Sequence, residues 1–326
     1  IGSLEANDDG HIDVAHVAVG VHDALRYAVA AHDSAENVDQ NGLHRRILED
    51  DSEGFFHAGS IGAGGALSFL IAGYAAEHLD WQTAFIISAL GSFAALIIMI
   101  TCVPSRKPPP QNEKSHPFEF LPVLKNKSAM AYAIGYCVHT WEMFTLRSWV
   151  VAFLVFTAAQ GDQPNFFIPT VIAMLMELIG TMMSIVGNEI AIRMGRRRWI
   201  FMVMIVSMMF AVLIGFSAGL GYGVAAMVCL TYNAIIYADS SSLTAGTVGN
   251  AETGRRGATL AVHAMLGYGG GFVGPLVLGV ILDILGGETV MNWGIAFSHV
   301  ALIMLIGPIV LRILKPNDLP GDRPSG

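Results

Sequence analysis

Apolar stretches of about 18 residues or more recur along the chain from Phe55 onward, separated by short polar breaks. A helix needs about 20 predominantly apolar residues to cross the hydrocarbon core of a bilayer. The stretches are continuous rather than alternating, which favours helices over barrel strands. The pattern therefore predicts eight transmembrane helices, over 55–76, 83–103, 128–157, 166–187, 199–220, 222–243, 258–285 and 292–313.

Positive charges after residue 54 fall into alternate connections of this pattern. Lysines and arginines lie between the second and third, the fourth and fifth, and the sixth and seventh predicted helices, and after the eighth. The other connections contain none, and Arg147 alone lies in the interior of a predicted helix, since Arg312 is at the end of the eighth. Because cytoplasmic loops retain positive charge, we expect a multi-pass integral protein of the plasma (inner) membrane. Both ends of the eight-helix region are expected in the cytoplasm.

Residues 1–54 differ from the rest of the chain in composition. They contain 12 acidic side chains and three arginines, whereas the remaining 272 residues contain 14 acidic and 15 basic side chains. The most apolar stretch of the segment, 12–31, is interrupted by Asp23 and Arg26, and a charge near the bilayer centre costs about 3 kcal/mol. We therefore expect a polar, acidic segment outside the membrane, either disordered or frame-shifted.

Composition excludes several classes of protein. Only 13% of the residues are charged and 53% are hydrophobic, against about 25% charged residues in soluble domains. So few charges cannot cover a water-exposed surface, which excludes a soluble domain and a nucleic-acid binder with a basic face. The expected partners are the lipid bilayer, a small-molecule substrate and protons, with no nucleic acid and no obligate protein partner.

The sequence offers little support for an enzyme or a metal site. It contains no His-Glu-x-x-His and no phosphate-binding loop, so we expect no enzyme activity. Cys102, Cys137 and Cys229 lie in or beside apolar stretches without paired spacing, and the histidines of the first 54 residues match no metal motif. We therefore expect no metal and no cofactor.

The apolar region contains an internal repeat. Two predicted helix pairs, the first with the second and the seventh with the eighth, share residues six helices apart and in the same membrane orientation. At an offset of 206 residues, His57, Gly64, Gly65 and Gly73 recur as His263, Gly270, Gly271 and Gly279. A parallel six-helix repeat is the organisation of one large class of transporters.

Three features resemble the major facilitator superfamily. The sequence GYGGGFVGP over 267–275 is similar to the family's glycine-rich helix motif, and the loop 187–198 is similar to its cytoplasmic-loop signature ending in Arg-x-Gly-Arg-Arg. The polar, proline-rich connection 104–127 resembles the linker between the two halves of such a transporter. Ile192 stands where the family's loop usually carries an aspartate.

This resemblance implies an all-α polytopic bundle in which the eight predicted helices are family helices five to twelve, with the first four missing. Residues 55–103 would be the last two helices of the N-terminal half, and 104–127 the cytoplasmic linker. Residues 128–314 would be the C-terminal six-helix half, and 315–326 a cytoplasmic tail. The implied function is secondary active transport of a small solute by alternating access, with proton coupling and an organic anion as the candidate solute. The alternative is a non-transporting remnant of such a transporter, from a truncated or frame-shifted gene.

Ionisable groups inside membrane helices are costly and indicate function by default. In the third predicted helix, His139, Glu142 and Arg147 fall within an arc of about 140°. The guanidinium of Arg147 suits a carboxylate or another oxyanion, with Glu142 or His139 carrying a coupling proton. The alternatives are that Arg147 pairs with an acid to hold helices together, or that it extends to the outer interface.

Three further polar residues are candidates for substrate binding or proton coupling. Glu177 lies near the middle of the fourth predicted helix, either as a proton site or as a buried partner of Arg147. Asp239 lies in the sixth, either as a proton or gating site or as a solvated acid. Asn233 shares a face of that helix with Tyr237.

The loop motif and the glycine-rich helix predict structural roles. Glu189 and Arg193, spaced i,i+4, can pair at the membrane interface, and with Gly195 and Arg196 they form a candidate gate or topology anchor. The glycines of the GYGGGFVGP stretch form a face without side chains that allows another helix to approach closely. The packing candidates are Gly267, Gly270, Gly271, Gly274 and Pro275.

Overall fold

A computed structural model of the protein describes residues 63–75, 78–103, 120–161 and 167–324. The described residues are helical or connect helices, and no strand occurs among them. The predicted acidic segment 1–54, the start of the first predicted helix and positions 104–119 of the predicted linker lie outside the described residues.

Among the described residues, two helices precede the predicted linker. One runs from Ala63 to Ala75, within the first predicted helix, and α3 (Trp81–Cys102) matches the second. The carboxylate of Asp80 caps α3 by accepting a hydrogen bond from the backbone N–H of Thr83 (2.7 Å). This hydrogen bond lowers the pKa of Asp80 below its usual value. No residue of α3 is buried, as expected of a helix whose surface contacts lipid or other membrane helices.

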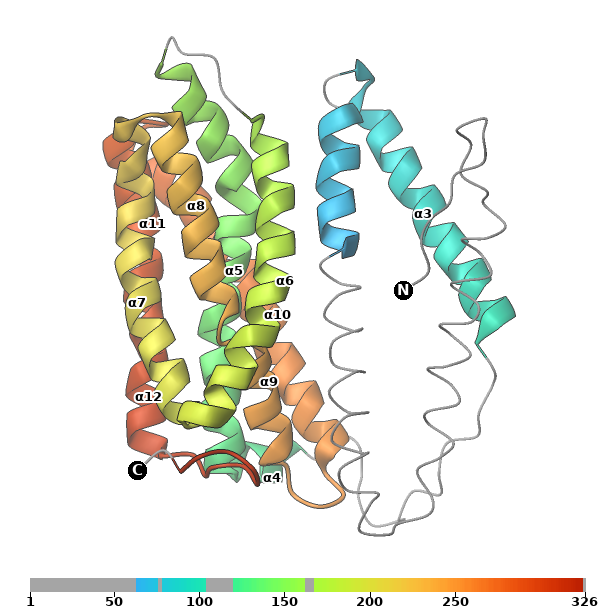
Figure 1. The fold of residues 1–326 in the computed structure, drawn as a ribbon, viewed down its shortest axis with the longest axis vertical. Coiled ribbons are helices and arrows are strands. Elements are labelled where there is room, and N and C mark those ends of the chain that lie inside the picture. The colour runs from blue at the N-terminus through green and yellow to red at the C-terminus, as the bar shows by residue number, and fades with distance from the viewer. Residues whose placement is uncertain (1–62, 76–77, 104–119, 162–166, 325–326) are drawn as a thin grey trace. The chain divides into compact units, whose positions relative to one another are not determined.

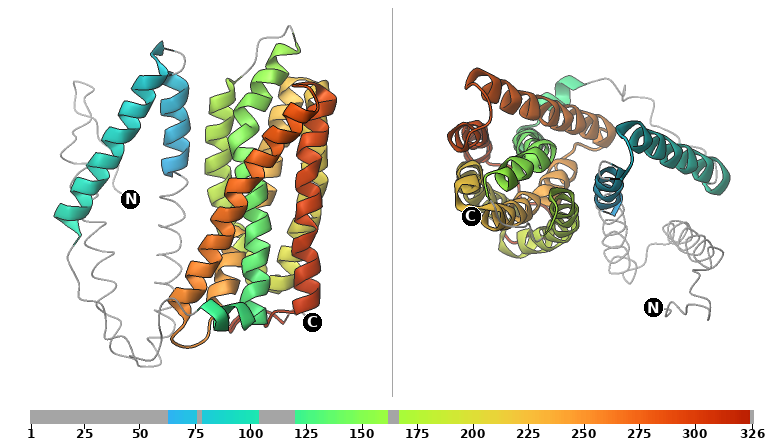
Figure 2. Two further views of the ribbon diagram at one scale, coloured as in Figure 1. Left: turned by 180° about the vertical axis from the view of Figure 1, so that it is seen from behind. Right: turned by 90° about the horizontal axis from the view of Figure 1, so that it is seen from above.

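The remaining helices form a bundle (Figures 1 and 2). Their bounds are α4 Phe120–Lys125, α5 Lys127–Ala159, α6 Pro169–Met194, α7 Arg196–Ser217, the 3-10 turn η2 Ala218–Leu220, α8 Tyr222–Tyr237, α9 Ser240–Gly249, α10 Arg256–Ile284, α11 Val290–Met304 and α12 Ile306–Leu314. With α3, the described chain has six helices long and apolar enough to cross a membrane, where η2 extends α7 and α12 extends α11. The protein is therefore a multi-pass membrane protein.

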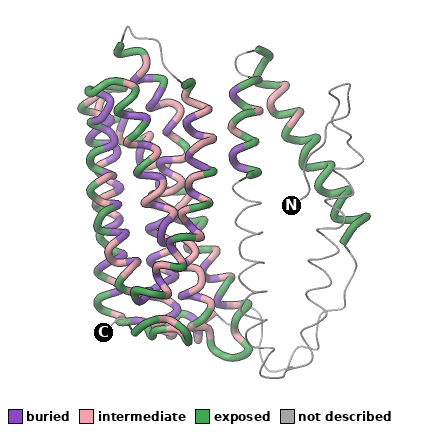
Figure 3. The backbone as a smooth tube through the Cα atoms, viewed as in Figure 1, coloured by how far each residue is buried: buried purple, intermediate pink, exposed green. Residues whose placement is uncertain are grey.

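The core of the bundle is formed by buried residues of α5, α6, α7, α8, α10 and α11, and Figure 3 shows the buried positions along these helices. Phe153, Trp293 and Phe297 form an aromatic cluster with ring centroids 5.3 to 5.8 Å apart. This cluster joins α5 to α11 through edge-on and stacked contacts, the arrangements that aromatic pairs prefer.

Glycines let α10 approach the backbone of α5. A Cβ atom on Gly270 would overlap the carbonyl oxygen of Cys137, and one on Gly274 would lie 2.7 Å from that of Trp141. Gly269 lies outside this contact, because a Cβ atom added there would have no neighbouring atom within 4 Å. Gly267 and Gly271 face Tyr136 and Phe144 of α5, and the carbonyl oxygen of Pro275 accepts a hydrogen bond from Trp149.

The prediction of one continuous helix over 222–243 is wrong. The structure has two helices there, α8 and α9, which separate at Ala238 and Asp239. The carbonyl oxygen of Ala238 accepts a hydrogen bond from the indole N–H of Trp199 on α7 (2.9 Å). The break therefore depends on a contact with a distant part of the chain, which the local hydropathy does not contain.

The eighth predicted helix, 292–313, is also divided, into α11 and α12 at Leu305. Pro308 has no N–H to donate to the carbonyl of Met304, so the helical hydrogen-bond ladder is interrupted there. The two helices still form one membrane-length segment of 25 residues.

The connections with basic residues gather at one end of the bundle. The turn between α6 and α7, the connection between α9 and α10, and the chain after α12 lie at the same end as α4 (Figure 1). The connection between α7 and α8 lies at the opposite end and contains no lysine or arginine. Within the bundle, the charges therefore sort to one end as the sequence pattern requires.

Candidate functional site

The ionisable side chains of α5 contact three different partners. His139 lies against the α8–α9 break, Glu142 contacts α7 and α8, and Arg147 contacts α6. The sequence pattern places them on one wide face of one helix. The structure gives each of them its own partner rather than joining them into a single cluster.

Glu142 is buried in the middle of the bundle, with 1% of its surface exposed. Its Oε1 atom accepts hydrogen bonds from Ser207 of α7 (2.6 Å) and from the hydroxyl of Tyr232 of α8 (2.7 Å). The carboxyl group therefore connects three helices through hydroxyl donors.

His139 and Asp239 form a buried pair. The His139 Nδ1 and Asp239 Oδ1 atoms are 2.9 Å apart, and their side chains are 0% and 2% exposed. The distance is that of an ion pair, whereas the geometry falls short of a hydrogen bond. The Nε2 atom of His139 has no hydrogen-bond partner in the described part of the chain. Because Asp239 is buried, the alternative of a solvated acid at this position does not hold.

Tyr136 stacks between two histidines. Its ring centroid lies 5.8 Å from that of His139 and 3.9 Å from that of His263 on α10. The Nδ1 atom of His263 is 3.1 Å from the hydroxyl of Thr247 on α9. A continuous row of polar and titratable groups thus runs from Asp239 through α5 to α10.

Arg147 and Glu177 pair between α5 and α6. The Arg147 Nε and Glu177 Oε1 atoms are 3.3 Å apart. The glutamate side chain is 6% exposed, whereas the arginine side chain is 30% exposed. The guanidinium is therefore partly accessible while its carboxylate partner is buried, so the acid partner foreseen as one sequence alternative is present.

Asn233 has a backbone partner. Its side-chain amide donates a hydrogen bond to the carbonyl oxygen of Met176 (2.5 Å) and is buried. This contact ties α8 to α6 one residue away from Glu177, so Asn233 supports the site and does not line it.

The residues of the loop motif separate into two groups. Glu189 and Arg193 form an i,i+4 pair at 2.6 Å with side chains 55% and 74% exposed. Gly195 has a φ of 93°, a backbone conformation that favours glycine, and it forms the turn between α6 and α7. Arg196, which follows, is buried and pairs with Asp322 in the C-terminal segment.

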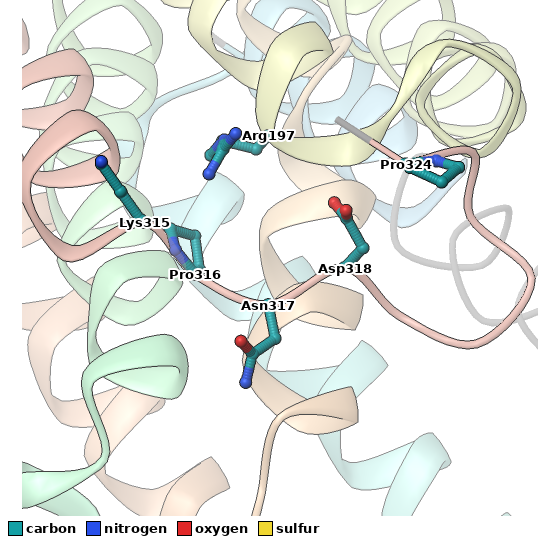
Figure 4. Close-up of a pocket in the computed structure, with 6 residues that line it drawn as sticks. All are labelled: Arg197, Lys315, Pro316, Asn317, Asp318 and Pro324. Carbon is teal, nitrogen blue, oxygen red and sulfur yellow. The ribbon is translucent and has the colours of Figure 1, made fainter. Parts of the chain in front are cut away.

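A cavity of about 550 Å³ lies at this same end of the bundle (Figure 4). None of the residues predicted to bind substrate or protons lines it. Its lining residues are Arg197, Lys315, Pro316, Asn317, Asp318 and Pro324. Among the described residues, no group of three His, Cys, Asp or Glu side chains is arranged to hold a metal ion.

Several site residues were missed from the sequence. Ser207 and Tyr136 carry hydroxyl groups within apolar helices, but serine and tyrosine are common there and only the fold selects these two. The sequence contained one indication that Tyr136 belongs to the site, because Tyr136 lies three residues before His139 on the same helix face. Asp322 had none, since it lies in a polar segment after the last helix.

Comparison with known proteins gives one result. A sequence model of the Major Facilitator Superfamily matches residues 54–275, which is more than half of the 326 residues. No curated protein matches the chain. The match includes α5, the whole glycine-rich stretch 267–275 of α10 and every candidate residue of the buried site.

Proposed function

The chain belongs to the Major Facilitator Superfamily, a family of membrane transporters, and we propose that it moves a small organic anion together with protons by alternating access. In this proposal the solute site and the proton sites are both organised around α5. The solute site is Arg147 with Glu177, and the proton sites are Glu177, Glu142 and the pair of His139 with Asp239.

The partly exposed pair of Arg147 and Glu177 carries the proposal. Close charge-assisted hydrogen bonds between an arginine and a carboxylate are about 2.7 to 2.9 Å long, so the 3.3 Å contact is loose. A planar guanidinium can donate two parallel hydrogen bonds to a carboxylate. An anionic solute can therefore take the place of Glu177 on Arg147.

Proton uptake gives this exchange a driving force. When Glu177 binds a proton, it becomes neutral and releases the guanidinium, which then binds the anionic solute. The charge of the loaded site is unchanged, because one negative charge is neutralised as another arrives. A buried ion that loses its partner is strongly destabilised, so solute and proton are expected to bind together.

The other buried groups supply further proton sites. Glu142 has hydroxyl partners, and His139 has a ring nitrogen without a hydrogen-bond partner in the part of the chain described. The titratable groups that face His139 are Tyr136, Glu142 and Asp239, with His263 beyond Tyr136. These contacts support a proton route across the bundle from α8 to α10.

The organisation proposed for the whole chain follows the sequence analysis. It has eight membrane spans, a plasma-membrane location, both ends of the eight-span region in the cytoplasm, and a C-terminal six-helix half over 128–314. The family match begins at residue 54, where the acidic composition ends, and this supports a boundary at that point.

A chain that transports nothing is the second candidate. The abrupt change of composition near residue 54 favours it. Reading the genomic DNA upstream in all three frames separates the two. Four further apolar spans in another frame would assign transport to the intact gene.

Uptake by proteoliposomes tests the proposed function. A panel of labelled mono- and dicarboxylates, neutral sugars and amines is offered with and without an inward proton gradient. We expect at least one carboxylate to accumulate only when the gradient is present. Uptake of every compound at the rate of protein-free liposomes would contradict the proposal.

A further inference from the structure

The chain after α12 crosses the end of the bundle as an extended segment, residues 315–324, here called the C-terminal strap. It has no regular secondary structure apart from one turn. Contacts fix it to four different helices, α5, α9, α7 and α6. They are, in chain order, Asn317 with Ser128, Leu319 with Gly249, Asp322 with Arg196 and Arg323 with Ile192.

Asp322 makes the strongest of these contacts. Its two carboxylate oxygens accept hydrogen bonds from Nε (2.8 Å) and Nη2 (2.9 Å) of Arg196, in a bidentate arrangement. The side chains of Arg196 and Asp322 are 4% and 3% exposed. Loss of one partner from a buried bidentate pair leaves an uncompensated buried charge and is strongly destabilising, whereas loss of a surface pair has little effect.

Arg196 also donates hydrogen bonds to two other helices. Its Nη1 atom donates to the side-chain oxygen of Asn188 on α6 (2.8 Å) and to the carbonyl oxygen of Ser242 on α9 (3.3 Å). Ser242 lies in the first turn of α9, three residues after Asp239 at the α8–α9 break. The orientation of Arg196 set by Asp322 therefore holds α6, α7 and the start of α9 together.

The strap is attached at separate points rather than packed along its length. The cavity of about 550 Å³ lies between Arg197 of α7 and the strap residues Pro316 to Asp318 and Pro324 (Figure 4). Release of the strap therefore breaks polar contacts and the packing of the buried Pro316 and of Leu319, without opening the apolar core of the bundle.

We propose that the C-terminal strap is a releasable latch, closed in this structure, and that Asp322 is the positioning residue that holds Arg196 in its clamp on α6 and α9. The latch fixes α9 relative to α6 and α7 at the basic end of the bundle. When Asp322 leaves, Arg196 loses its only carboxylate among the described ion pairs, and the start of α9 loses its tie to α7. The inference goes beyond transport and does not depend on the identity of a solute.

The latch is tested by cysteine labelling of the full chain in detergent. Cys102 and Cys137 are replaced by alanine, Leu319→Cys reports on the strap, and the native Cys229 is kept because it is completely buried in the bundle. The probe is a maleimide, and the measured quantity is its rate of reaction at each cysteine. No transport assay is needed, so failure of the latch and failure of the proposed function are distinguishable.

Asp322→Asn is expected to raise the labelling rate at position 319 about tenfold or more, because Arg196 loses its charged partner, while Cys229 stays unlabelled. Arg323→Gln is the matched control. It changes a charge on the neighbouring, exposed side chain but keeps the backbone N–H that donates to Ile192. Its labelling rate should equal that of the parent.

Three outcomes overturn the proposal. An unchanged rate in Asp322→Asn would mean that Asp322 does not hold the strap. An equal increase in Arg323→Gln would mean that the net charge of the strap is responsible. Simultaneous labelling of Cys229 would mean that the pair maintains the whole bundle rather than a local latch. As a second variant, Arg196→Gln combined with Asp322→Asn should react no faster than Asp322→Asn alone, and multiplied rates would contradict a shared contact.

Discussion

Tyr232 and Tyr222 lie on the same helix, α8, with hydroxyl groups in different surroundings. The hydroxyl of Tyr232 donates to the buried carboxylate of Glu142, whereas that of Tyr222 donates to the carbonyl of Phe167 at an exposed position. We predict that Tyr232→Phe lowers the free energy of unfolding by about 1 to 2 kcal/mol, because a buried acceptor loses a donor.

Tyr222→Phe is the control, with an expected loss below about 0.6 kcal/mol, since water replaces the lost partner. Reversible unfolding in mixed detergent measures both values. Equal losses in the two variants would mean that the Glu142 contact contributes no more than a surface hydrogen bond.

At the level of single residues, the sequence identifies the ionisable side chains that are costly to bury in membrane helices, but it does not identify their partners. His139, Glu142 and Arg147 are detectable because charged side chains stand out within apolar helices. Their partners come from other helices, so pairing Arg147 with Glu177 rather than with another acid requires the fold. The burial of Asp239 is likewise set by the break in its own helix.

The close contact between α5 and α10 leads us to predict different effects of substitution at two adjacent glycines. Gly270→Ala places a methyl group against the backbone of Cys137, where the close approach leaves no room. We expect a loss of about 1 to 3 kcal/mol in the free energy of unfolding, as for other overpacked cores.

Gly269→Ala is the matched control, because its added methyl group meets no neighbouring atom. Its effect on the free energy of unfolding should stay within about 1 kcal/mol, and alanine favours the helix. If the two substitutions were equally damaging, helix flexibility rather than close packing would explain the glycines.

Helices longer than 20 residues were predictable, whereas their interruptions were only partly so. The ends of α3, α5 and α10 lie within two residues of the predicted ends because apolar length sets them. The predicted end of the fourth helix at 187 is wrong, because α6 continues to Met194 through most of the predicted loop 187–198. The division of α11 from α12 has a local cause in Pro308. The division of α8 from α9 does not, since it depends on the hydrogen bond from Trp199.

Across the whole molecule, proton coupling predicts a specific phenotype for Glu177→Gln. Glutamine resembles the protonated acid, so Arg147 stays available to the anion without proton uptake. Accumulation of a carboxylate driven by a proton gradient should be lost, while exchange of labelled for unlabelled carboxylate persists.

Glu288→Gln provides the comparison, because Glu288 is an exposed acid in the connection between α10 and α11. It should keep both activities. Retention of gradient-driven accumulation in Glu177→Gln would exclude Glu177 as the coupling site.

An all-helical, multi-pass membrane protein was readable from two signals: apolar length and the sorting of basic residues. These signals survive because the bilayer imposes them on any sequence that crosses it. The attachment of the C-terminal strap was not readable, since a polar segment with Gly, Pro and Asp is typical of a solvated tail. Only the position of Arg196 at the start of α7 gives Asp322 a partner.

The central claim is that Arg147 holds the anionic solute, and uptake by Arg147→Gln proteoliposomes tests it most directly. Arg312→Gln is the matched control, because Arg312 is an exposed arginine at the end of α12. Using whichever carboxylate the parent accumulates, we predict a loss of at least about 100-fold in uptake rate for Arg147→Gln, equivalent to about 2.7 kcal/mol for a charged contact. Arg312→Gln should match the parent. Uptake by Arg147→Gln at the parent rate would contradict the account.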